Sequence, residues 1–98
     1  MNNDHEPYEK LTEKTRDYTR ALNSMMEEIE AVDWYQQRMD ICNDQQLKKI
    51  LKHNRNEEME HAIMLLEWLR RNMDGWDEQI NTYLNTSADI TNVESLKK

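Results

Sequence analysis

Apolar residues recur every three or four positions along most of the chain, a spacing that predicts amphipathic helices rather than strands. The first stripe of this kind runs from Tyr8 to Met39. Pro7 suits the first turn of a helix, because its missing N–H has no partner there in any case. We therefore expect one long helix over residues 6–40.

A second stripe follows the break at residues 42–44, where Asn43 or Asp44 can cap the next helix. It predicts a helix over residues 44–73, and so short a connection makes the two helices antiparallel neighbours. This helix carries a further apolar stripe over its C-terminal half, at Met59, Ile63, Leu66 and Met73. Two stripes on one helix need two packing partners, and the chain itself supplies one.

Gly75 is expected to cap the end of the second helix, and residues 75–84 have the spacing of a short third helix. The remaining residues, 85–98, are mostly polar and predict a tail. The expected fold is all-α, a helical hairpin plus a short helix in one domain over residues 1–84. A hairpin of this size cannot enclose a core, so we expect two copies to pair into a four-helix bundle.

Composition narrows the function classes. The formal net charge of −7 disfavours nucleic-acid binding, which needs a basic surface. The chain has no run of 18 apolar residues and its N-terminus is polar, so we expect neither a membrane span nor a signal peptide. The single cysteine, Cys42, excludes an internal disulfide and suits the cytoplasm.

One Glu-x-x-His motif, Glu58 to His61, occupies the apolar seam of the second helix. Residues three apart lie about 60° apart around a helix and about 4.5 Å along it, so both side chains can reach one ion. Carboxylate and imidazole ligands suit iron, manganese or zinc. The alternatives are that the seam turns outward at this point, or that Glu58 pairs with Arg55 or with a lysine of a neighbouring molecule.

Glu28 lies beside the seam of the first helix. It precedes Cys42 by 14 residues and Glu58 follows Cys42 by 16, so an antiparallel hairpin places the two carboxylates at nearly the same height. Dinuclear carboxylate sites in four-helix bundles use a lone Glu from two helices and a Glu-x-x-His from the other two. The chain thus carries half of such a site, unless Glu28 is simply a solvated side chain.

Other residues near Glu28 have both functional and structural interpretations. Tyr35 shares its face and can hydrogen-bond a ligand or donate an electron, or can be a core aromatic residue. Glu27, Glu30 and Trp34 form a stripe that can attract cations, or can be a solvated acidic face. Glu57 and Glu60 flank the motif, and we expect them to face solvent or to form ion pairs between subunits.

Three segments resemble the encapsulated ferritins, half-ferritins carried as cargo inside encapsulin shells. They are Glu-Glu-Ile-Glu-Ala-Val-Asp-Trp-Tyr (27–35), His-Asn-Arg-Asn-Glu-Glu-Met-Glu-His-Ala (53–62) and Leu-Glu-Trp-Leu-Arg-Arg-Asn (66–72). The resemblance covers roughly residues 6–84. It implies a two-helix subunit whose dimer rebuilds the ferritin four-helix site within a ring-shaped homodecamer.

The resemblance also implies roles for individual residues. Glu28, Glu58 and His61 match the family's iron ligands, and Tyr35 matches its site tyrosine. Glu27 and Glu30 match an acidic metal-uptake pair of the family, and Trp34 lies close to it. This pair is expected to accept Ca²⁺ or another divalent cation. The implied activity is that of a ferroxidase, which oxidises Fe²⁺ to Fe³⁺ with O₂ for iron storage and detoxification inside an encapsulin nanocompartment in the cytoplasm.

One feature departs from the family, which carries a capsid-targeting peptide after a flexible linker. This chain ends at Glu94-Ser-Leu-Lys-Lys without a linker, and Ser95-Leu96-Lys97 is a very short match to such a peptide. The departure predicts a shortened chain or a lost association with the shell.

Two other functions remain open. The first is a non-catalytic oligomerisation module in which metal only staples subunits together. The second is a rubrerythrin-like di-iron redox protein, although the absence of a Cys-x-x-Cys pair argues against a form with a rubredoxin-type site.

Overall fold

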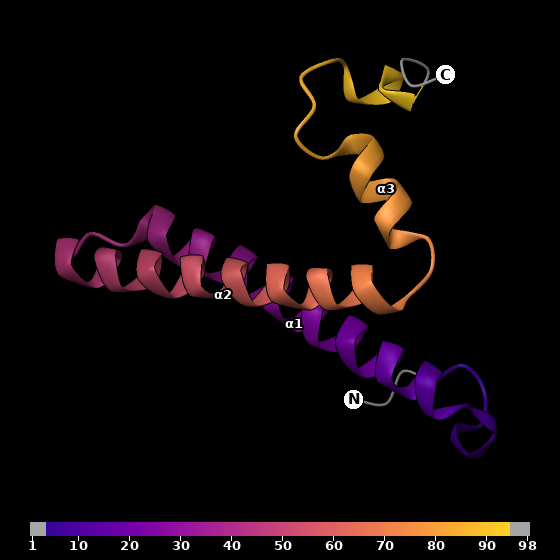
Figure 1. Ribbon diagram of the computed structural model, residues 1–98. Coiled ribbons are helices and arrows are strands. Elements are labelled where there is room, and N and C mark those ends of the chain that lie inside the picture. The colour runs from indigo at the N-terminus through magenta and orange to yellow at the C-terminus, as the bar shows by residue number, and fades with distance from the viewer. Residues whose placement is uncertain (1–3, 95–98) are drawn as a thin grey trace.

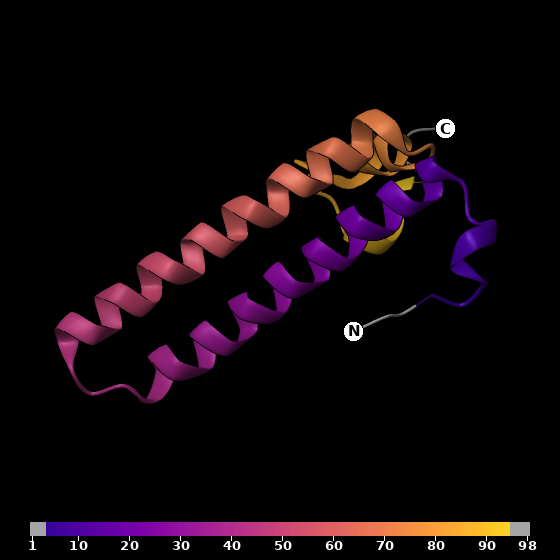
Figure 2. The same ribbon diagram turned by 90° about the horizontal axis from the view of Figure 1, so that it is seen from below.

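Two long antiparallel helices, α1 (Glu13–Ile41) and α2 (Gln45–Asn72), form the body of the computed structural model, which describes residues 4–94. The helices lie side by side along most of their length (Figures 1 and 2). A short helix, α3 (Trp76–Tyr83), leaves the end of α2 and points away from the hairpin. The expected all-α hairpin with a short third helix is confirmed.

The turn between the helices follows the expected capping chemistry. The Asp44 carboxylate accepts a hydrogen bond from the backbone N–H of Leu47 at 2.8 Å, which satisfies one of the free donors in the first turn of α2. The two residues between the helix end and this cap are Cys42 and Asn43. A link this short keeps α1 and α2 in contact from the turn onward.

The start of the first helix differs from the prediction. The chain forms a separate 3₁₀ helix at Tyr8–Lys10, and α1 begins at Glu13 rather than near residue 6. Thr12 is extended and caps α1, its hydroxyl accepting from the N–H of Thr15. The guanidinium of Arg16 donates to the Tyr8 carbonyl at 2.7 Å and covers the Tyr8 ring, which holds the preceding segment back against the helix.

Gly75 also has a different role from the one expected. Met73 is the C-cap of α2, and Gly75 lies two residues further on, with a φ of 102° that favours glycine. This conformation turns the chain into α3, of which Gly75 is the N-cap. Arg70 holds the new direction, since it hydrogen-bonds Glu67 on α2 and Asp77 on α3.

Beyond α3, a further 3₁₀ helix spans Ile90–Asn92, and Val93 beside it is 2% exposed. The division into a domain over residues 1–84 and a tail over 85–98 stays a prediction. The short match at Ser95-Leu96-Lys97 lies outside the described residues. Within residues 4–94, no helix combines the length and the apolar character that crossing a bilayer would demand.

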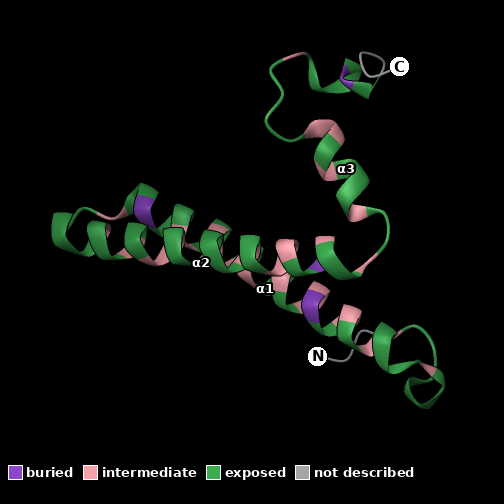
Figure 3. Cartoon of the chain, viewed as in Figure 1, coloured by how far each residue is buried: buried purple, intermediate pink, exposed green. Residues whose placement is uncertain are grey.

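The hairpin has almost no enclosed core (Figure 3). Among the described residues, the buried apolar side chains are Ala21, Met39, Leu69 and Val93. The radius of gyration is 17.5 Å, against about 13 Å for a compact domain of similar length. Large apolar side chains stay exposed on the outer faces, among them Met26, Ile29, Trp34, Met59, Ile63 and Met64. A lone chain therefore leaves much apolar surface in water.

Candidate metal centre

Three potential metal ligands converge where α1 and α2 face each other. Glu28 comes from α1, and Glu58 and His61 come from successive turns of α2. Their ligand atoms all lie within 4.8 Å of one another. The similar height predicted for Glu28 and Glu58 is confirmed. Both helices extend from the same short turn with the same rise per residue, so residues at similar distances from the turn lie side by side.

The separations fit a metal ion. His61 Nδ1 lies 3.4 Å from Glu28 Oε2 and 3.5 Å from Glu58 Oε2. Neighbouring ligand atoms held about 2.0–2.2 Å from one ion lie about 3.0–3.5 Å apart. The two carboxylates, when ionised, also supply the two negative charges that balance one divalent cation.

Glu28 supplies the clearest evidence that the cluster suits a metal ion. Its Oε2 atom is buried and has no hydrogen-bond partner, because the nearby His61 Nδ1 does not meet it with hydrogen-bond geometry. A buried carboxylate oxygen without a partner is costly, and a metal ion would satisfy it. The interpretation of Glu28 as a solvated side chain therefore does not fit the structure.

Arg55 does not take the role of partner to Glu58. Its guanidinium donates to Gln36 on α1 and to the neighbouring Asn56. The two helices are thus tied together one turn from Glu58 without neutralising it. The carboxylate of Glu58 remains directed toward His61.

The three ligands lie at the surface of the hairpin rather than inside it. The Glu28 and Glu58 side chains are each 24% exposed and that of His61 is 45% exposed. Next to them, residues of both helices line a groove between α1 and α2: Asp17, Arg20, Ala21, Ser24, Leu65 and Trp68. Ser24 is one turn from Glu28 and Leu65 is one turn from His61, so the groove continues the open side of the cluster.

The other predicted site residues lie nearby on α1. Tyr35 is half-buried two turns after Glu28, with the Arg38 guanidinium 5.4 Å from the centre of its ring. Glu27 and Glu30 are exposed, and Trp34 is 49% exposed. This arrangement suits both a cation-attracting face and a solvated acidic face, so their metal-uptake role stays a prediction.

Glu57 is exposed, in agreement with one of the two expectations for it. It also lies between two histidines, with Oε1 3.0 Å from His53 Nε2 and Oε2 3.9 Å from His61 Nε2. This row of side chains on α2 was not foreseen from the sequence. The spacing of His53, Glu57 and His61, four residues apart each time, is the signal in the sequence that could have revealed this row.

Comparison with known proteins agrees with the site and the fold. The EncFtn-like family model matches residues 3–87. The chain belongs to the EncFtn-like family. The match includes α1, α2 and α3, and therefore all three residues of the metal cluster.

Named relatives of this EncFtn-like chain come from two bacteria. A "Ferritin-like protein" of Thermotoga maritima is 63% identical over 90 residues, which are 92% of this chain and 79% of that protein. An "Encapsulated ferritin-like protein" of Rhodospirillum rubrum is 55% identical over 94 residues, 96% of this chain and 67% of that protein. The resemblance inferred from the three sequence segments is thus confirmed.

A solved structure supports the fold of the EncFtn-like chain. The crystal structure of protein ne0167 from Nitrosomonas europaea superposes with a TM-score of 0.87 at 49% sequence identity. The alignment covers 91% of this chain and 98% of that one. The hairpin with a divergent third helix is therefore found in a related protein.

Proposed function

We propose that the protein is a ferroxidase whose di-iron site forms between two copies of the chain. The observation that carries the proposal is the convergence of Glu28, Glu58 and His61 around a buried, unpartnered carboxylate oxygen at an open surface. The ferritin-like names of the two relatives support iron as the metal.

One chain supplies half of the ligands of a dinuclear carboxylate site. Such sites in helical bundles use two lone glutamates and two Glu-x-x-His motifs, and each hairpin has one of each. Two hairpins related by a two-fold axis would bring their open ligand clusters together. The four carboxylates of Glu28 and Glu58 would then balance the charge of two Fe²⁺ ions.

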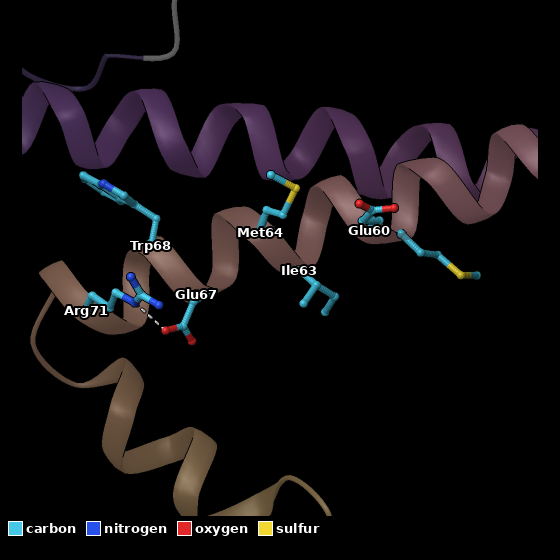
Figure 4. A pocket seen from close by; sticks show the side chains of 7 residues that line it. Glu60, Ile63, Met64, Glu67, Trp68 and Arg71 are labelled. Carbon is cyan, nitrogen blue, oxygen red and sulfur yellow. Dashed lines mark hydrogen bonds and ion pairs between the residues drawn. The ribbon is translucent and has the colours of Figure 1, made fainter.

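The surface around the cluster is suited to such pairing. Ala21 and Ser24 are small, so a second helix can approach α1 closely beside the ligands. On the adjoining face of α2, a hollow of about 650 Å³ is lined by Met59, Glu60, Ile63, Met64, Glu67, Trp68 and Arg71 (Figure 4). Burying this surface against another copy would remove apolar area from water at about 25 cal/mol per Å².

Each ligand has a distinct task in the proposed reaction. Glu58 and His61 of one chain would hold one Fe²⁺ ion, and the Glu28 carboxylates of the two chains would complete the ligand set. Oxygen-rich ligation favours Fe³⁺ over Fe²⁺. Each Fe²⁺ loses one electron, and O₂ accepts two electrons with two protons to give hydrogen peroxide, or four of each to give water.

We also propose that the protein acts in the cytoplasm inside an encapsulin shell, as part of a ring-shaped decamer. The support is the name of the Rhodospirillum rubrum relative, an encapsulated ferritin-like protein. In this arrangement Fe³⁺ leaves the ring and is stored elsewhere in the compartment. Tyr35 would support oxidation, and Glu27 and Glu30 with Trp34 would draw Fe²⁺ or other divalent cations toward the site.

Anaerobic loading with Fe²⁺ followed by O₂ tests the proposal. A ferroxidase gives a fast rise in ferric absorbance whose rate saturates with Fe²⁺ and lies well above the rate without protein. A module in which metal only staples subunits would give the protein-free rate, and that result would overturn the proposal. Consumption of added peroxide without O₂ uptake would favour a rubrerythrin-like function instead.

A further inference from the structure

The imidazole of His61 faces two different sets of carboxylates. Its Nδ1 atom points at Glu28 and Glu58, and its Nε2 atom lies 3.9 Å from Oε2 of Glu57. The other oxygen of Glu57 lies 3.0 Å from Nε2 of His53, close enough to accept a hydrogen bond. The three side chains thus form a row along one face of α2.

This arrangement bears on metal binding because a neutral imidazole carries one proton. A metal can bind Nδ1 only when that proton is on Nε2. Glu28 and Glu58 lie around Nδ1 and favour the proton there, on the atom that the metal needs. Of the three carboxylates within 4.0 Å of the ring nitrogens, Glu57 is the one beside Nε2, so it favours the opposite tautomer.

We propose that Glu57 is a positioning residue that accepts the Nε2 proton of His61 and leaves Nδ1 free to bind the metal. Histidines that bind metals generally donate their second N–H to such an acceptor, which also fixes the orientation of the ring. His53 holds the Glu57 carboxylate on this side of the helix. The inference rests on the proposed function, because it requires His61 to bind the metal through Nδ1.

The present separation of 3.9 Å is an ion-pair distance and exceeds that of a direct hydrogen bond. The Glu57 side chain is 48% exposed, so it can rotate toward the ring, or one water molecule can bridge the two groups. Either path gives the Nε2 proton an acceptor. Glu57 therefore acts on the metal through His61 and is not itself a ligand in this account.

The affinity of the assembled protein for Zn²⁺, measured by competition with a chelator, tests the role. Glu57→Ala should weaken binding about 10–100-fold, the usual cost of losing such an acceptor. Glu57→Gln keeps an acceptor oxygen and should lose clearly less. Glu78→Ala is the matched control, because it removes the same charge from an exposed position on α3, away from the ligand cluster.

A second measurement follows the proton directly. The chain has three histidines, so ¹⁵N-histidine spectra of the Zn²⁺-loaded protein are simple. The signal that disappears in His61→Ala belongs to His61. His61 should carry its proton on Nε2, and that proton should exchange with water faster in Glu57→Ala. A role limited to helix stability would leave this exchange unchanged and would lower the helix content seen by circular dichroism.

The outcomes separate this inference from the proposed function. If His61→Ala binds Zn²⁺ as tightly as the wild type, the metal site itself is wrong. If His61→Ala loses binding but Glu57→Ala behaves like Glu78→Ala, the site stands and the role of Glu57 is overturned. A proton on Nδ1 of His61 in the Zn²⁺-loaded protein would also overturn it.

Discussion

Oε2 of Glu28 on α1 lies 3.4 Å from Nδ1 of His61 on α2, with no hydrogen bond between them. The two atoms are held near each other by helices that are fixed by the turn and by the Arg55 contact to Gln36. The site is therefore shaped by the backbone before any metal arrives. Such preorganisation reduces the conformational cost of binding an ion.

Replacing the ligands on α2 should stop iron oxidation without unfolding the hairpin. Glu58→Ala and His61→Ala each remove a ligand whose side chain is partly exposed, so helix content should stay near that of the wild type. The rate of ferric absorbance after O₂ addition should fall to the protein-free rate. Glu78→Ala, which removes an exposed carboxylate on α3, should keep most of the activity. Wild-type rates in either ligand variant would remove that residue from the site.

Glu28 should reduce the stability of the metal-free protein. Its buried, unpartnered oxygen costs about 1–3 kcal/mol by the usual desolvation penalty. Glu28→Leu should therefore raise the melting temperature without metal, yet abolish the further rise that divalent metal gives the wild type. Thermal melts with and without Zn²⁺ measure both effects. A metal-free variant that melts below the wild type would contradict this view of Glu28.

The ion pairs of Glu67 that hold Arg70 in place at the end of α2 should weaken in acid. Hydrogen bonds from Arg70, and then from Arg71, lower the pKa of Glu67 from 4.5 to about 2. A carboxyl group whose pKa is lowered by folding stabilises the folded protein at pH values above its ordinary pKa of 4.5. This contribution is lost as the pH falls from about 4.5 toward 2. The effect should be small, because the group is exposed.

Amide hydrogen exchange in α3, measured across this pH range, tests whether Arg70, held by Glu67, keeps α3 in place through Asp77. Exchange corrected for its intrinsic pH dependence should speed up in the wild type as the pH drops. Arg70→Met should show the faster exchange at neutral pH as well, since Arg70 also donates to Asp77 on α3. Arg71→Met is the control, because Arg71 donates to Glu67 on α2 and not to Asp77 on α3. Equal exchange in all three proteins would show that Arg70 does not hold α3.

The sequence was sufficient for the hairpin and for the meeting of Glu28 with Glu58. One short break and a constant helical rise determine which residues share a height. The start of α1 was not predictable in this way, because it depends on the contact of Arg16 with Tyr8. The row of His53, Glu57 and His61 was also missed. Its four-residue spacing is visible in the sequence, but the spacing alone does not show which ring atom of His61 lies near Glu57.

A variant of Ser24 tests most directly whether catalysis needs two copies of the chain. Ser24 is exposed beside the ligand cluster, so Ser24→Lys should block a close second helix, whereas Ser24→Ala should not. Size-exclusion fractions of each protein, with mass measured by light scattering, would be assayed for iron oxidation per chain. We predict that monomeric Ser24→Lys oxidises iron at the protein-free rate and that assembled Ser24→Ala matches the wild type. A stable monomer that oxidises iron at the full rate would contradict the account.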